Sequence, residues 1–241
     1  MPVDSGGRDD GTTVTHPFST MPRMAATMLG QGLYDAAEVG WLLGHDAEWV
    51  VRWSTDSSAG PAIITPTFAR MFSFADLVSF RVGLMIRQQG VSDRHLRRGA
   101  ETLRSRTGLA KPLASRDVIA SLATSGDSFL SDLGSGEFED IGRGGQGVFQ
   151  EVVRVHLTRI TFDVDGGPER WVPAEGVVID PAIQAGAPCI AGTRVPTATV
   201  VALLTEEEPE DVALDFNVTV EAVQLAQRFE QLLADGVGLA A

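Results

Sequence analysis

The chain has 241 residues, of which 44% are hydrophobic, so it is long enough for one large domain or two to three small ones. It contains no run of about 18 apolar residues and no basic start followed by an apolar stretch, so we expect a cytoplasmic protein without a membrane span. The single cysteine, Cys189, excludes an internal disulfide and a cysteine zinc cluster.

The net charge of −13 is unevenly distributed along the chain. Residues 52–106 carry nine Arg against four acidic residues, net +5, whereas residues 177–241 carry two Arg against ten acidic residues, net −8. A local basic face can bind phosphate even when the rest of a chain is acidic, and an acidic face repels DNA. The distribution therefore predicts nucleic-acid contacts in the first half and protein contacts in the last quarter.

Residues 1–31 are rich in Gly, Thr, Ser and Pro and predict a mobile arm. Residues 35–53 then predict two short helices, capped by Asp35 and Asp46 and separated by a turn at Gly44. A short helix, a break with glycine and a second short helix have the spacing of a helix-turn-helix. The same pattern also occurs in ordinary helical cores, so both interpretations stay open here.

Residues 54–67 predict a loop and a short strand that would suit a wing. Ser73, with an acid three residues later, begins a longer helix that ends at Gly90, and Ser92 caps the next helix. Along one side of that next helix we expect the basic residues Arg94, Arg97, Arg98 and Arg104. Such a row can follow a phosphate backbone, or it can be a solvated helix surface.

Residues 109–176 predict a small α+β unit. We expect strands at 128–133 and 138–141, a helix over 146–160, and a hairpin over 161–172 that turns at two glycines. Within this unit, residues 142–147 match the phosphate-binding pattern G-x-G-x-x-G. Asp163, at the spacing of a ribose-binding acid, lies in the predicted hairpin, and no further βαβ units follow, so we expect no cofactor.

No pattern typical of catalysis is present elsewhere. Cys189 lies among apolar neighbours and is expected to be a small buried residue. His156 is expected in a helix core, and the consecutive acids 206–208 point in different directions on a helix, which does not suit a metal site. We therefore predict no catalytic residue, no metal and no enzyme activity.

Residues 177–241 begin with a predicted strand at 177–180 and a segment rich in Gly and Pro. Three helices are expected, at 197–204, 210–216 and 219–233. The third presents to the core a row of apolar residues at helical spacing, namely Val223, Ala226, Phe229 and Leu233. The arrangement is again similar to a helix-turn-helix, but its acidic surface favours a protein partner over DNA.

Two family patterns are visible in these residues. Residues 33–104 resemble the MerR-like winged helix-turn-helix, through the segments 36–44, 50–53, 72–78, 81–82 and 87–92. Residues 177–233 resemble the domain-of-unknown-function family 433, through 177–180, the G-x-P-x-I-x-G-T-R-V-P pattern at 186–196, the segment 215–219 and Val223. The combination resembles mycobacterial VapB-type antitoxins.

This resemblance implies a partner and a role. It implies that a PIN-domain ribonuclease toxin is the protein partner, that the chain neutralises it, and that the chain represses their shared promoter. We further expect a homodimer that places its two second helices in successive major grooves of a palindromic site. In the second helix, family members often carry Pro, Ser or Thr where this chain has Asp46, Glu48 and Trp49. The long dimerising helix of metal-sensing MerR proteins is also missing, so ligand sensing of that type is not implied.

The sequence thus predicts an α+β protein made of a mobile arm (1–31), a winged helix-turn-helix (32–108), an α+β unit (109–176) and a three-helix domain (177–241). We expect a DNA-binding antitoxin; the alternative is a stand-alone MerR-like regulator without a toxin. The predicted DNA contacts are Arg52, His45, Trp49, Arg70, Arg94, Arg97 and Arg98. The predicted partner contacts are Arg194, Glu206 and Glu207.

Overall fold

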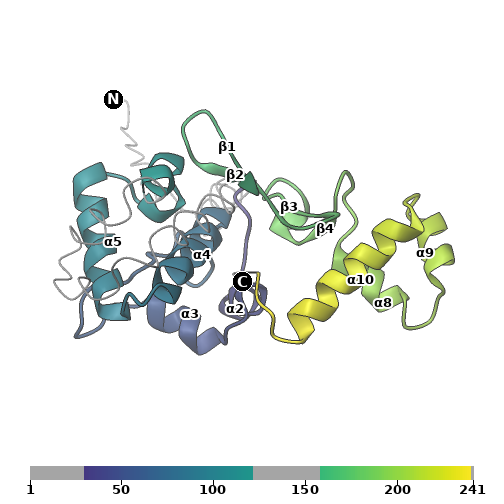
Figure 1. Ribbon diagram of the computed structural model, residues 1–241, viewed down its shortest axis with the longest axis horizontal. Coiled ribbons are helices and arrows are strands. Elements are labelled where there is room, and N and C mark those ends of the chain that lie inside the picture. The colour runs from purple at the N-terminus through teal and green to yellow at the C-terminus, as the bar shows by residue number, and fades with distance from the viewer. Residues whose placement is uncertain (1–29, 122–157, 240–241) are drawn as a thin grey trace, which may run out of the picture.

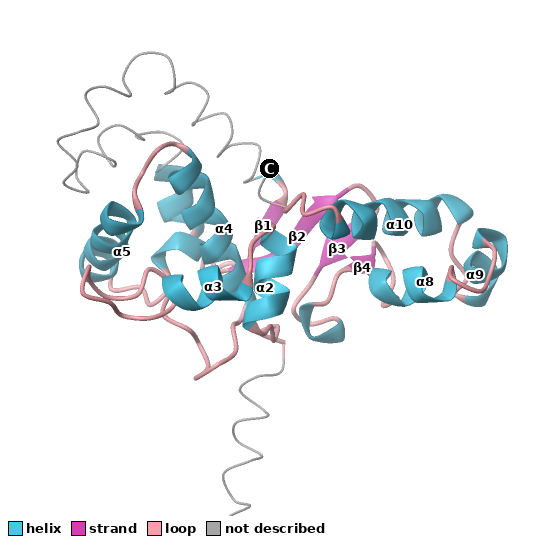
Figure 2. Ribbon diagram, turned by 90° about the horizontal axis from the view of Figure 1, so that it is seen from below, coloured by secondary structure: helices cyan, strands magenta, loops and turns pink. Residues whose placement is uncertain are grey.

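The computed structural model describes residues 30–121 and 158–239. The described residues form an α+β fold in which a four-stranded antiparallel sheet lies between two groups of helices (Figure 1). The first group and the last three helices lie at opposite ends of an elongated molecule (Figure 2). The predicted arm, the strands at 128–133 and 138–141, the glycine pattern at 142–147 and His156 lie outside the described residues.

The two predicted short helices near the start are confirmed as α2 (Ala36–Leu43) and α3 (Ala47–Trp53). Asp35 accepts a hydrogen bond from the Glu38 amide at 2.8 Å, and Asp46 accepts one from the Trp49 amide at 2.7 Å. Each cap supplies an acceptor to an amide that has no partner inside the helix. Gly44 ends α2 with φ +72°, a left-handed conformation that glycine adopts without strain.

The longer helices are confirmed as α4 (Phe74–Gln88) and α5 (Asp93–Thr107), which begin at the predicted caps Ser73 and Ser92. At the start of α4 the Ser73 side chain accepts from the Asp76 amide while the Asp76 carboxylate accepts from the Ser73 amide. Nearly all of α4 is buried, because α2, α3, α5 and the short helix η2 (Pro112–Ala114) surround it. Residues 116–121 are helical as well.

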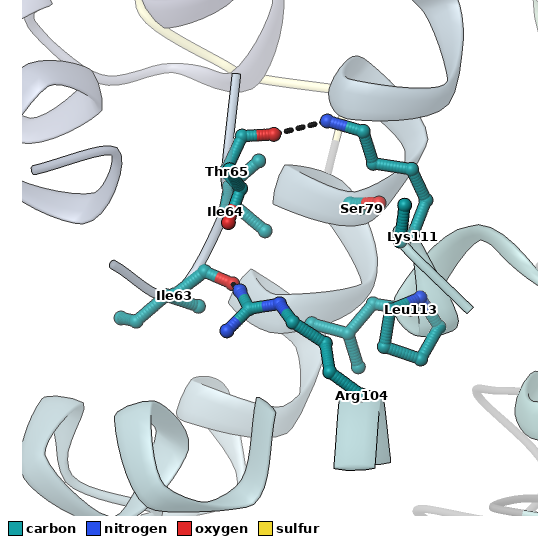
Figure 3. Close-up of a pocket in the computed structure, with 9 residues that line it drawn as sticks. Ile63, Ile64, Thr65, Ser79, Arg104, Lys111 and Leu113 are labelled. Atoms are coloured by element: carbon teal, nitrogen blue, oxygen red, sulfur yellow. Dashed lines mark hydrogen bonds between the residues drawn. The ribbon is translucent and has the colours of Figure 1, made fainter. Parts of the chain in front are cut away.

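The predicted wing strand within 54–67 is wrong. In this segment of the described chain, the only β-bridge joins Ser57 and Gly60, and no strand forms. The carbonyls that a strand would offer to a neighbouring strand are bound by side chains instead. Arg97 donates to the Pro61 carbonyl at 2.9 Å, Arg104 donates to the Ala62 and Ile63 carbonyls, and Lys111 donates to Thr65 (Figure 3).

The sheet contains β1 (Ile160–Phe162), β2 (Pro168–Ala174), β3 (Val177–Ile179) and β4 (Cys189–Ile190) in that order. The predicted hairpin is confirmed as β1 and β2, and Asp163 stabilises its turn by accepting from the amides of Asp165 and Gly167. The helix predicted to reach residue 160 is wrong at its end, because Ile160 pairs with Trp171 in the sheet.

The three predicted C-terminal helices are confirmed within one residue at each end. They are α8 (Thr197–Leu203), α9 (Pro209–Asp215) and α10 (Val220–Ala234). The predicted inward residues of α10 are buried, namely Val223, Ala226, Phe229 and Leu233. This agreement follows from the Thr219 cap, the proline at the first position of α9 and the regular apolar spacing of α10.

The predicted boundary between residues 176 and 177 does not separate two packing units. Strands β2 and β3 pair across it, and Phe229 and Leu233 of α10 belong to the same buried cluster as the residues of α2, α3 and α4. A second, smaller cluster lies among α8, α9 and α10. The segment after α10 also returns to α2, where the Leu239 amide donates to the Leu42 carbonyl at 2.9 Å.

Candidate nucleic-acid interface

Helix α3 has one buried side and one exposed side. Trp49 and Trp53 face the core and are 4% and 0% exposed, and their ring centroids lie 4.4 Å apart. The prediction that Trp49 contacts DNA is therefore wrong, because packing against Trp53 and Phe80 covers its ring. The exposed side carries Glu48 and Arg52, so the predicted contact Arg52 lies on the surface.

His45 lies in the turn between α2 and α3, with its ring stacked on Trp49 at a centroid distance of 4.2 Å. Burial lowers the pKa of His45, and the charges of Arg87 and Arg52 lower it further, against the opposing effect of Asp46. The imidazole is therefore biased toward its neutral form, and the two guanidinium groups lie close enough to influence it.

Arg97 is the clearest departure from the predicted row of basic residues. Its side chain is 4% exposed and donates three hydrogen bonds to backbone carbonyls, those of Arg52 (2.5 Å), Thr55 (2.9 Å) and Pro61 (2.9 Å). The prediction that it contacts a phosphate backbone is wrong, because its donors are already used inside the protein. Arg104 points the same way and binds the carbonyls of Ala62 and Ile63.

The other predicted residues of this row, Arg94 and Arg98, are exposed. The start of α5 adjoins the end of α3, since the Trp53 indole donates to Asp93 at 3.3 Å. Asp93 also pairs with Arg87 at 2.8 Å, which brings the end of α4 to the same place. We call Arg52, Arg87, Arg94 and Arg98 the arginine face. Sequence reasoning had not chosen Arg87, although it counted among the nine arginines of this region.

Arg70 is exposed in the segment that precedes α4, as a surface contact requires. Within residues 30–121 and 158–239, no hydrogen bond or ion pair connects Arg70 with the arginine face. The structure therefore leaves Arg70 on the surface but does not place it in one site with the arginine face.

Arg81 is a basic residue that the fold uses internally. It lies over the ring of Trp171 at 4.3 Å and donates to the carbonyl of Leu239. Burial lowers the pKa of Arg81 to about 9, with a further contribution from Arg159. The guanidinium thus joins α4, the sheet and the segment after α10, and it is not available to an external ligand.

The hollow beside the Arg104 and Lys111 contacts is not a ligand site (Figure 3). It is lined by residues 63–65, Ser79, Arg104 and residues 110–113, and its open volume is about 10 Å³. A single water molecule needs roughly 10–15 Å³, so this space has room for about one water molecule and not for a larger ligand. A more open hollow lies on the surface of α3, lined by Ala47, Glu48, Val51 and Arg52.

The predicted partner-binding residues lie at the other end of the molecule. Arg194 is exposed, and its carbonyl accepts from the Gln184 side chain at 3.0 Å. Glu206 is exposed and Glu207 is half-buried in the turn after α8, where both amides donate to the Leu203 carbonyl. On the adjacent α9, Leu214 is 78% exposed among acidic residues.

Within residues 30–121 and 158–239, no group of three or more His, Cys, Asp or Glu residues is placed to hold a metal ion. Cys189 is buried as predicted, and burial raises the pKa of its thiol. No helix of the described chain combines the length and apolar character of a membrane span.

Residues 177–229 match the family described as "Protein of unknown function (DUF433)", in agreement with the C-terminal resemblance. The X-ray crystal structure of Rv2018 from Mycobacterium tuberculosis is similar to this chain, with a TM-score of 0.66 and 26% identity. The similarity covers 83% of this chain and 98% of that chain. No curated protein matches the sequence.

Proposed function

We propose that this protein is a DNA-binding antitoxin that represses its own promoter through the arginine face and α3, and holds a protein toxin at the acidic end formed by α8, α9 and α10. The observation that carries the proposal is the exposed arginine face around the end of α3, with Arg97 holding the Arg52 carbonyl beneath it. Arginines fixed on rigid elements suit phosphate contacts, and the helix between them suits the major groove.

The opposite end supports the second half of the proposal. Its helices carry exposed acids and an exposed leucine, which suit a basic protein surface with an apolar pocket and do not suit DNA. The resemblance to VapB-type antitoxins implies that this partner is a PIN-domain ribonuclease. A homodimer would place two copies of α3 in successive major grooves of a palindromic site.

DNA binding is tested with the full chain and the DNA upstream of its own gene, by fluorescence anisotropy at several salt concentrations. We expect the double variant Arg52→Ala, Arg98→Ala to bind more weakly, with a log–log salt slope smaller by about two. Arg228→Ala is the matched control, because Arg228 is exposed on α10. Unchanged affinity in the double variant would contradict the placement of the DNA site.

Toxin binding is tested by co-expression with the product of the adjacent reading frame, followed by measurement of the mass of the complex. Charge-neutral variants are better than truncation, because β3 and α10 are part of the shared core and β4 pairs with β3. We expect Glu206→Gln, Glu207→Gln to reduce the retained partner, and Glu169→Gln, Glu175→Gln to leave it unchanged. Promoter binding without any retained partner would instead favour a stand-alone regulator.

A further inference from the structure

The exposed side of α3 carries three chemically different side chains within one helical turn. Glu48, Val51 and Arg52 stand at positions i, i+3 and i+4, so they are neighbours on the helix surface. Together with Ala47 they line the open hollow on this helix. The combination of an acceptor, an apolar group and a donor is what the side of a helix needs to distinguish base pairs.

The packing of the protein does not account for a valine at position 51, because its side chain is not in the core. It is 51% exposed, whereas the neighbouring Trp49, Val50 and Trp53 are all buried. The polar groups beside it are also unused, since neither the Glu48 carboxylate nor the Arg52 guanidinium has a hydrogen-bonding partner among residues 30–121 and 158–239. All three side chains are thus available to an external molecule.

The position of α3 is fixed by its surroundings. His45 stacks on Trp49 at the start of the helix, and Arg97 binds the Arg52 carbonyl at its end. The exposed Arg94 and Arg98 lie on the first turns of α5, next to the end of α4, where Arg87 pairs with Asp93, and from there they can hold phosphates. Phosphate contacts of this kind set the register of a helix on DNA, and side chains between them then meet the base edges.

The base edges of the major groove match the three side chains. The C5 methyl of thymine is the apolar group in the groove, the cytosine N4 amine is a donor, and guanine offers the acceptors N7 and O6. Side chains one helical turn apart are separated by roughly 5–6 Å. Successive bases rise by about 3.4 Å, so the three side chains span about two adjacent base pairs.

We propose that α3 reads a thymine through its C5 methyl group, which enters the hollow beside Val51 and Ala47, next to a C·G pair that Glu48 and Arg52 read. Glu48 accepts from cytosine N4, and Arg52 donates to guanine N7 and O6. This inference rests on the proposed function, and it adds the base contacts that give sequence specificity.

The test uses deoxyuridine, which differs from thymidine only by the absence of the methyl group. DNA sites are first selected from a random library by the full-length protein, and each thymine of the selected site is then replaced singly by uracil. We expect one replacement to weaken binding by about 3–5-fold, the value for one buried methyl group. Val51→Ala should remove this discrimination while binding uracil DNA about as tightly as the unaltered protein does.

The controls separate base reading from general binding. Leu214→Ala removes another exposed apolar side chain, on α9 and far from α3, and should keep the discrimination between thymine and uracil. Glu48→Gln should change the preference at the adjacent C·G pair and leave the uracil effect intact. A selected site in which every thymine can be replaced without loss, or discrimination that persists in Val51→Ala, would overturn the inference. Failure to select any sequence would overturn the proposed function itself.

Discussion

The two ends of the molecule have the same arrangement of helices but surfaces of opposite charge. At one end, α2 and α3 form a pair of short helices packed on the long α4, and at the other end α8 and α9 form a pair packed on the long α10. The first pair begins at Asp35 and Asp46 caps and presents arginines nearby. The second pair has no side-chain caps and presents acids.

The comparison shows that packing and surface charge are set independently. Both pairs bury apolar residues at helical spacing, and that spacing determines the fold. The exposed residues between them determine which class of partner each end can approach. The following experiments test that separation, beginning with the largest expected effect.

Phe229→Ala tests whether the two ends are one cooperative unit. Phe229 lies on α10 but packs in the cluster that includes α2, α3 and α4, so we expect the free energy of unfolding to fall by about 3–5 kcal/mol. Urea unfolding should give the same midpoint by tryptophan fluorescence and by circular dichroism. Separate midpoints would show that the two ends unfold independently.

Arg97→Ala and Arg98→Ala compare an inward and an outward arginine on the same helix. Loss of Arg97 leaves the carbonyls of Arg52, Thr55 and Pro61 without their donor, so we expect a destabilisation of about 2–3 kcal/mol in urea unfolding. Arg98→Ala should cost less than about 0.5 kcal/mol because the side chain is exposed. Equal losses of stability in the two variants would contradict the assignment of Arg97 to the interior and Arg98 to the surface.

Glu230→Gln tests a half-buried acid at the acidic end. Burial raises the pKa of Glu230, while the hydrogen bond from Thr197 opposes this rise. A raised pKa in the folded state means that this group favours folding at low pH, and that the contribution is lost as the pH rises above the ordinary value of 4.5. We expect the variant to be slightly more stable than the unaltered protein at pH 7.

The measurement for Glu230→Gln is the difference in thermal midpoint between variant and unaltered protein from pH 4 to pH 7. The difference should increase with pH, because glutamine keeps a neutral acceptor for Thr197 at every pH. Glu175→Gln, an exposed position, is the control and should show no such trend. A difference that decreases with pH would show that the pKa of Glu230 is not raised in the folded protein.

Leu214→Gln should have the smallest effect on the fold and a larger one on the partner. Leu214 is 78% exposed, so we expect the free energy of unfolding to change by less than about 0.5 kcal/mol. If the acidic end holds the toxin, this apolar side chain is a natural anchor, and the co-purified partner should decrease several-fold. Full retention would place the contact elsewhere.

The sequence predicts the helices well because their signals are local. The caps Asp35, Asp46, Ser73, Ser92 and Thr219 all begin helices in the structure. The exposed position of Arg52 also follows from helical spacing. The buried Trp49, Val50 and Trp53 lie on one side of the helix, and Arg52 lies on the other side. Local hydrogen bonding and periodicity therefore account for most of the described secondary structure.

The errors arise where distant residues decide the outcome. Residues 61–65 have the composition of a strand, but Arg97, Arg104 and Lys111, more than thirty-five residues away, bind their carbonyls. The same contacts turn Arg97 inward, which no local pattern indicates. The sequence around Trp49 allows an exposed aromatic contact as well, but in the structure Trp53 and the distant Phe80 of α4 cover its ring.

The return of the chain onto α2 has a practical consequence for handling this protein. Gly238 lies against the backbone of Leu43 and Gly44, where an added Cβ atom would come within 2.2 Å of the Leu43 carbonyl carbon. An affinity tag or fluorescent reporter fused close behind Leu239 would therefore start beside the junction of α2 and α3. Purification handles and labels attached there should be cleaved before DNA affinities are compared.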